Sequence, residues 1–310
     1  FMDLKWLSIP WTSVGIVGTA VSFYIGFKNN QAYDRLWEAR KIWGSMINNS
    51  RIWGSNLRAY ITNHFTDNEI SDKQVKSIIK RLIYRHISYL YTLRNQLLEP
   101  APWEHISLNS HVAKLNKDRM KKFGIGTFED NLTDDILNQH LDKAEYKELR
   151  TYSNMATQII DVQSQELMQL RKDNIIDDFR HIELQKILNE FYSEQGKAER
   201  IKKFPLPRQY GSVSFIFVSI FVFLLPFGLI AEFEKIGSFG IWFFIPVVSI
   251  IAWIFILMEL VGDYSENPFE GLGNDVPMLS ICRTIEIDLK QMIKDDKIPE
   301  PIASKNGVLM

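Results

Sequence analysis

The chain has 310 residues and a nearly balanced charge, with 36 lysines and arginines against 37 acidic residues. This balance gives no support for nucleic-acid binding, which usually needs a strongly basic surface. The single cysteine, Cys282, excludes internal disulfides and thiolate metal clusters and suits a reducing compartment, and we expect it to be a core residue.

The first predicted element is an apolar helix over Trp6–Phe27, which opens with Ser8 and Pro10, a typical cap followed by proline in the first turn. It is long enough to cross a bilayer, which takes about 20 residues. Its serines, threonines and glycines suit burial against other helices or around water better than contact with lipid. We disfavour a secretory signal, because no basic leader precedes the apolar stretch and no small-residue cleavage site follows it.

Two sets of residues recur along this segment at helical spacing. They are Gly15, Thr19, Phe23 and Phe27 on one face, and Gly18, Ser22 and Gly26 on a neighbouring face. The second set is the arrangement of small residues that lets membrane helices approach closely. Several copies of the first set around an axis would line a pore with rings of side chains. From spacing alone, packing inside one subunit is the favoured interpretation of both faces.

Residues 31–205 are predicted to form a helical cytoplasmic domain, because they are mostly hydrophilic and rich in helix formers. One of its helices begins with the cap Ser71. The predicted helices cover Tyr33–Tyr60, Ser71–Leu98, Ile136–Leu141, Lys147–Leu170 and Ile175–Phe191, with a short helix and connector over Asn109–Asp130. Pro205 and Pro207 end the helical pattern.

Two further apolar stretches, Gly211–Ala231 and Ile236–Met258, contain no charged side chain and predict membrane-spanning helices. Only a short charged loop separates them, so we expect a helical hairpin. We assign residues 206–262 to this hairpin and residues 263–310 to a cytoplasmic belt segment with a C-terminal helix.

Basic residues predict the orientation of the spans. They follow the first span from Lys28 onward and precede the hairpin from Lys197 to Arg208, which places both flanks in the cytoplasm. The first span then runs from outside to inside, and we expect a further membrane helix upstream of Phe1. The expected location is the cell inner membrane, crossed several times.

No pattern in the sequence indicates an enzyme or a metal site. The six histidines lack the spacing of metal ligands on one helical face. The stretch Gly271–Asp275 lacks the lysine and the preceding strand of a phosphate-binding loop. The apolar spans contain no acid, base or histidine, which argues against an intramembrane enzyme.

Three motifs are long enough to be specific: Ile25 to Arg40 with Trp43, Glu266-Asn267-Pro268-Phe269, and Asn274-Asp275-Val276-Pro277. They resemble the bacterial branch of the bestrophin family, and the likeness covers nearly the whole chain. The resemblance implies a homopentameric ion channel in the lipid bilayer, with four membrane helices in each subunit. The missing upstream helix would then be the first of the four.

The resemblance also implies a hydrophobic neck on the second membrane helix, which is residues 1–30 here. The neck positions correspond to Thr19, Phe23 and Phe27. The family usually has an aliphatic residue at the position of Thr19, so a hydroxyl there should widen or wet the outermost ring. The two phenylalanine rings would form the main barrier, because apolar constrictions gate by expelling water.

A second, cytoplasmic aperture is implied at Leu206 and Pro207. Lys202 and Lys203 lie just upstream and could raise the concentration of anions at the mouth, or could simply anchor the membrane segment. Animal bestrophins bind calcium after the Asn-Pro-Phe motif, but only Glu270 and Asp275 remain of that acidic cluster. Calcium prefers six to eight oxygen ligands, so we expect no required cofactor.

The ion preference is only weakly indicated. The positive ring edges of Phe23 and Phe27, with the two lysines, favour chloride and other monovalent anions. Acids such as Glu259 and Asp263 could instead line the vestibule and favour sodium, although we expect most of them to pair with bases. The alternatives are therefore a cation channel of the same architecture, or a non-conducting membrane-anchored scaffold, which would have no use for a polar first span.

Overall fold

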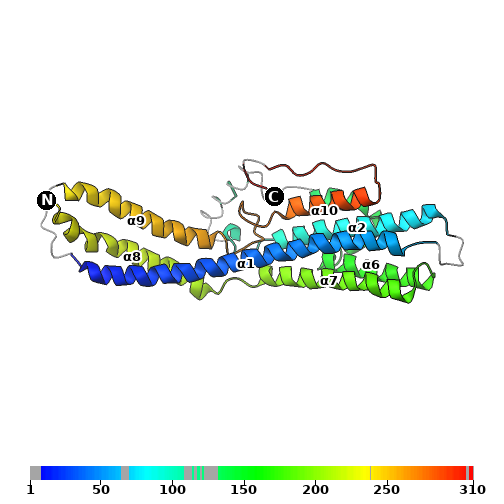
Figure 1. Cartoon of the computed structure of the whole chain (residues 1–310), viewed down its shortest axis with the longest axis horizontal. Helices are drawn as coiled ribbons and strands as arrows, with labels where there is room; N and C mark the ends of the chain where they lie inside the picture. Colours follow the sequence, from blue (N-terminus) through cyan, green and yellow to red (C-terminus); the bar gives the residue numbers. More distant parts are fainter. Residues whose placement is uncertain are drawn as a thin grey trace. The chain divides into compact units, whose positions relative to one another are not determined.

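Helices form the framework of the chain. The computed structural model describes residues 8–63, 70–107, 114, 117–118, 121, 132–237, 239–304 and 307–309. None of these residues lies in a β-strand, which confirms the predicted all-α fold. The helices are α1 (Trp11–Tyr60), α2 (Asp72–Leu98), the 3-10 turn η2 (His105–Ser107), α4 (Leu132–His140), α5 (Lys143–Leu149), α6 (Met155–Lys172), α7 (Asp178–Lys203), α8 (Arg208–Glu234), α9 (Gly240–Asp263) and α10 (Met278–Met292) (Figure 1).

The chain divides into two compact units. Unit 1 comprises Phe1–Trp37 and Phe204–Asn267, and unit 2 comprises Glu38–Lys203 and Pro268–Met310. Both units draw on segments that are far apart in the sequence. Helix α1 is continuous over 50 residues, so it joins the predicted span to the helix expected over Tyr33–Tyr60. The residues between them, Lys28 to Ala32, include neither glycine nor proline, and nothing there ends a helix.

Helices α8 and α9 lie side by side as a hairpin in unit 1 (Figure 1). Within the described residues, two stretches are long and apolar enough to cross a membrane, Val213–Glu234 and Trp242–Asp263. The N-terminal part of α1 does not reach the same hydropathy, because serines, threonines and glycines interrupt its apolar residues.

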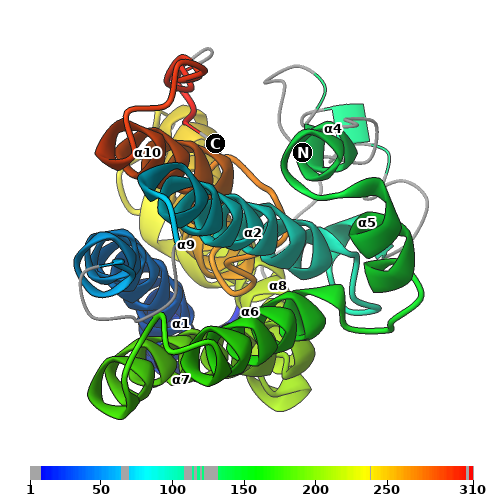
Figure 2. The same ribbon diagram turned by 90° about the vertical axis from the view of Figure 1, so that its right-hand side faces the viewer.

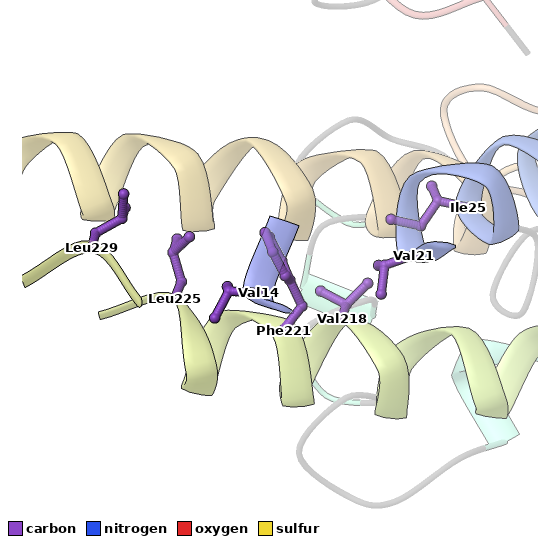
Figure 3. Packing of buried hydrophobic residues seen from close by; sticks show 7 residues of the cluster. All are labelled: Val14, Val21, Ile25, Val218, Phe221, Leu225 and Leu229. Atoms are coloured by element: carbon purple, nitrogen blue, oxygen red, sulfur yellow. The ribbon is translucent and has the colours of Figure 1, made fainter. Parts of the chain in front are cut away.

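The core of unit 1 lies between α1 and the hairpin (Figure 3). Its buried side chains are Val14, Val21 and Ile25 of α1, with Val218, Phe221, Leu225 and Leu229 of α8. Gly18 is a point of close approach, because a Cβ atom there would lie 2.6 Å from the ring of Phe221. No described atom lies within 4 Å of the corresponding positions on Gly15 and Gly26. Of the predicted small-residue face, Gly18 therefore packs inside the subunit, whereas Gly26 faces open space.

Helix α2 is central to unit 2, where it contacts α4, α6, α7 and α10 (Figure 2). The predicted cap is confirmed, since Ser71 accepts from the backbone N–H of Gln74 and the Gln74 side chain accepts from the backbone N–H of Ser71.

Cys282 of α10 is fully buried, as expected, and burial raises the pKa of its thiol to about 12.

The prediction of one helix over Lys147–Leu170 was wrong, because the chain ends α5 at Leu149 and begins α6 at Met155. Asn154 explains the break. Its side chain accepts a 3.1 Å hydrogen bond from the N–H of Thr157 and so caps a new helix. Helix α4 begins four residues before the predicted Ile136. The predicted connector over Asn109–Asp130 lies, apart from four isolated positions, outside the described residues.

Helix α7 runs on to Lys203, well past the predicted end at Phe191. No proline interrupts it before Pro205, which confirms that the prolines follow the end of this helix. Its start at Asp178 is later than predicted, because Ile175 and Ile176 are buried in the turn that follows α6.

Candidate functional site

One face of α1 carries large apolar side chains that no described part of the chain covers. Phe23 is 68% exposed and Phe27 is 65% exposed, whereas Val21 and Ile25 on the opposite face are buried in the core of unit 1. These rings line a groove of about 430 Å³ together with Thr19, Ser22, Gly26 and Asn30. The three residues predicted for the neck therefore share one groove on the surface of the subunit, and packing inside the subunit does not explain this face.

The hydroxyl groups in the groove are bonded to their own helix. Thr19 Oγ1 donates to the carbonyl oxygen of Gly15 at 2.9 Å, and Ser22 Oγ donates to that of Gly18 at 2.8 Å. Each hydroxyl then presents only its lone pairs to the groove. The groove thus combines two exposed aromatic rings with oxygen acceptors.

A buried ion pair lies behind the groove and was not predicted from the sequence as a unit. Lys28 of α1 is 1% exposed and packs against α9. Its Nζ lies 2.5 Å from Glu259 Oε1 and 3.8 Å from Asp263 Oδ1. Ser214 of α8 donates to the second oxygen of Glu259. The acids Glu259 and Asp263 are therefore paired with a lysine, as expected for most acids in this region.

Neighbouring contacts fasten the same stretch of α1 to the end of α9. Asn29 Nδ2 donates to the carbonyl of Met258 at 3.1 Å, and Asn29 Oδ1 would lie 2.2 Å from a Cβ added at Gly262, so the Asn29 side chain would have to shift for any larger residue there. Further along α1, Arg35 Nε donates to the carbonyl of Glu266 at 2.9 Å. Because these residues follow Phe27 closely, they fix the rotation of the helix that carries Thr19, Phe23 and Phe27.

The two residues predicted for the inner aperture are placed differently in unit 1. Pro207 is exposed and precedes the first turn of α8, whereas Leu206 is 7% exposed. The aperture stays a prediction. If Leu206 lines it, its side chain has to leave its buried position, because a ring residue must face the pathway.

The two lysines expected near the aperture also differ from each other in unit 2. Lys202 Nζ lies 2.5 Å from Glu104 Oε1 and donates to the carbonyl of Phe269, so its charge is paired. Burial raises the pKa of Glu104. Lys203 is 74% exposed and lies 3.5 Å from Glu199. Of these two lysines, Lys203 is therefore the one whose ammonium group is open to water.

The acids that remain after the Asn-Pro-Phe motif are occupied by donors from the chain itself. Glu270 lies 2.9 Å from His105 Nδ1, and Asp275 Oδ2 accepts from the backbone N–H groups of Gly271 and Leu272 at 2.7 and 2.9 Å. Burial raises the pKa of Asp275 to about 8. Within the described residues, no cluster of three or more histidines, cysteines or acids is arranged to hold a metal ion. This loop does not offer the oxygen cage that calcium prefers.

Comparison with known sequences decides the family. Residues 2–291 match the family described as Bacterial/Fungal Bestrophin protein. The chain belongs to the bestrophin family. The resemblance inferred from the Ile25 to Arg40 motif is therefore confirmed, and this bestrophin is a membrane protein by its family and by its two apolar helices.

Relatives with assigned names are distant but cover most of this bestrophin. The voltage-dependent anion channel-forming protein YneE of Escherichia coli K12 is 24% identical over 97% of this chain and 82% of its own length. The voltage-dependent anion channel-forming protein alr2987 of Nostoc is 26% identical over 92% of this chain and 80% of its own length.

Solved structures show the same fold. A bacterial bestrophin homologue from Klebsiella pneumoniae, crystallised as a point mutant, superposes with a TM-score of 0.73 at 20% identity, over 93% of this chain and 89% of that one. A second structure of the Klebsiella homologue, solved by Zn-SAD phasing, gives a TM-score of 0.72 at 21% identity, over 93% and 89%.

Proposed function

We propose that this bestrophin is the subunit of an ion channel that conducts small monovalent anions, chloride among them, passively through a hydrophobic neck. The observation that carries the proposal is the uncovered face of α1, where Phe23 and Phe27 are about two-thirds exposed beside Thr19 in one groove. Lipid contact would suit the two rings alone, whereas the same groove also contains Thr19, Ser22 and Asn30, and copies arranged around an axis would bring this mixed face together as a constriction. The names of the relatives from Escherichia coli and Nostoc, which are anion channel-forming proteins, support the preference for anions.

The proposed assembly is a homopentamer that crosses the cell inner membrane several times. Two hairpin helices and the first half of α1 would lie in the bilayer, and unit 2 would lie in the cytoplasm, as the basic residues near Lys28 and Lys197 indicate. Leu206 and Pro207 would form the inner aperture, with Lys203 adding positive potential at its mouth. Conduction of this kind needs no covalent chemistry and no catalytic residue.

A sodium channel of the same architecture is the second candidate, and the hydroxyl groups favour it. Thr19 and Ser22 donate their protons to backbone carbonyls, so they offer a cation their oxygen lone pairs. The sign of the permeant ion separates the two candidates.

The test is the reversal potential of the reconstituted protein in planar bilayers under a tenfold gradient of sodium chloride. Current that reverses near the equilibrium potential of chloride supports the proposal, and reversal near that of sodium supports the alternative. Replacing both Phe23 and Phe27 with alanine should raise conductance or alter gating. Unchanged current in that double variant would remove these residues from the neck, and absence of current in the wild-type protein would contradict a channel.

A further inference from the structure

The groove on α1 contains few groups that could hold an anion. Its lining residues are Thr19, Ser22, Phe23, Gly26, Phe27 and Asn30, all within the described residues. Glycine and phenylalanine have no polar side-chain hydrogen. An anion in water is held by O–H donors, so it loses these contacts in an apolar constriction unless the wall supplies N–H or O–H groups.

The two hydroxyl groups do not supply such donors. Thr19 and Ser22 donate to the carbonyls of Gly15 and Gly18 in the preceding turn, at 2.9 and 2.8 Å. Turning either proton toward an ion would break that bond. The nearby cation Lys28 is no substitute, because it is buried against Glu259 and is not among the residues that line the groove.

Asn30 differs from every other residue of the groove. Its side chain is exposed, and its carboxamide has no hydrogen-bond partner in the described part of the chain. At 100° per residue, Asn30 points within about 20° of the direction of Thr19, and it lies roughly 4.5 Å beyond Phe27 along the helix axis. It therefore continues the face of Thr19, Phe23 and Phe27 toward the cytoplasmic end.

We propose that Asn30 is a specificity-determining residue of the pathway, whose carboxamide N–H groups hold a monovalent anion as it enters or leaves the phenylalanine constriction. This inference rests on the proposed function, since it assumes that the groove faces the ion. In an assembly around an axis, each subunit would contribute one carboxamide to a ring at the inner end of the neck.

Loss of Asn30 should affect anions and cations differently, because the groove offers the two kinds of ion different partners. A cation could be held by the lone pairs of Thr19 and Ser22 as well as by Asn30 Oδ1, so loss of Asn30 removes one acceptor among several. An anion has the Asn30 N–H groups as its only hydrogen-bond donors among the described side chains of the groove, beside the weaker positive edges of the phenylalanine rings, so loss of Asn30 leaves it without a donor there. Removing the carboxamide should therefore reduce anion permeation far more than cation permeation.

The experiment compares Asn30→Leu and Asn30→Asp with the wild-type protein in planar bilayers, using reversal potentials in a tenfold sodium chloride gradient. Both replacements are close to asparagine in size and lie at an exposed position, and assembly is checked by size-exclusion chromatography. Asn30→Leu should lower the chloride-to-sodium permeability ratio about tenfold, the effect of losing a hydrogen bond to a charged group. Asn30→Asp should reverse the preference to sodium.

Gln31→Leu is the matched control, because Gln31 is an exposed carboxamide beside Asn30 that does not line the groove, and its ratio should stay within about twofold of wild type. A wild-type ratio that survives both Asn30 variants would overturn the role of Asn30 while leaving the channel intact. A wild-type protein that conducts sodium alone would also overturn it. A protein without current would instead refute the channel itself.

Discussion

The ammonium group of Lys28 lies 2.5 Å from Glu259 Oε1, although 231 positions separate the two residues in the chain. Both side chains are almost completely buried, and Ser214 donates to the other carboxylate oxygen. The pair therefore joins α1, α8 and α9 at the residue that follows Phe27. In a low-dielectric setting, removing one partner of such a pair leaves the other charge buried without compensation.

Lys28→Met should destabilise the protein by about 3–5 kcal/mol, because it leaves the Glu259 carboxylate buried without its counter-charge. Thermal unfolding in detergent measures the loss. The double variant Lys28→Met with Glu259→Leu removes both charges and should recover much of the stability. Equal losses in the single and double variants would show that packing, and not charge pairing, dominates this contact.

Gly18→Ala should destabilise unit 1 by about 1–3 kcal/mol, since the added methyl group would meet the Phe221 ring at 2.6 Å and overpack the core. Gly15→Ala is the control on the same helix. No described atom lies within 4 Å of its new methyl group, so it should be neutral or stabilising by about 0.5–1 kcal/mol through backbone entropy. The same melting experiment compares the two, and a similar loss in both would argue against a close contact specific to Gly18.

Burial of Asp275 should make unit 2 less stable as pH rises from 6.5 to 8. The pKa of Asp275 is about 8 in the folded state and 3.8 ordinarily, so at neutral pH the folded protein keeps a proton that the unfolded chain has lost. The stability that this proton contributes is lost as pH rises through 8. His86 acts in the opposite sense below pH 6.5, because burial lowers its pKa to about 3 and the unfolded chain then binds more protons.

Asp275→Asn keeps an acceptor for the N–H groups of Gly271 and Leu272 but cannot titrate. The slope of melting temperature against pH between 6.5 and 8 should therefore be smaller in this variant than in the wild-type protein. An identical slope in the two proteins would assign the pH dependence to other groups.

Thr19→Val should lower single-channel conductance several-fold, because it replaces the hydroxyl of the proposed outermost neck ring with a methyl group of nearly the same shape and makes that ring easier to dewet. The chloride-to-sodium ratio should not fall, since the Thr19 proton is bonded to the Gly15 carbonyl and is not offered to an anion, whereas valine removes an oxygen acceptor that a cation could use. Conductance equal to wild type would mean that this ring does not limit the flow.

The sequence was most informative where one physical effect dominates. The uncharged stretches of α8 and α9 predict membrane helices because the bilayer demands them, and the spacing of Thr19, Phe23 and Phe27 predicts a shared face because helical geometry is fixed. The structure adds that this face is exposed while Val21 and Ile25 pack against α8.

The remaining features depend on contacts between distant segments. Nothing near Lys28 in the sequence identifies Glu259 as its partner, and nothing near Lys202 identifies Glu104. The break between α5 and α6 was missed because apolar spacing continues across it, and the capping bond of Asn154 outweighs that pattern. Leu206 could not be recognised as buried, since its environment depends on tertiary packing.

The burial of Cys282 has a practical consequence for mapping the proposed ion pathway. The chain has one native thiol, and it is enclosed in the core with its sulfur donating to the carbonyl of Leu90. Because water-soluble maleimides react with exposed thiolates, this buried thiol should not be labelled at neutral pH. A reporter cysteine introduced at position 23, 27 or 30 would then be the reactive one, in an otherwise native background.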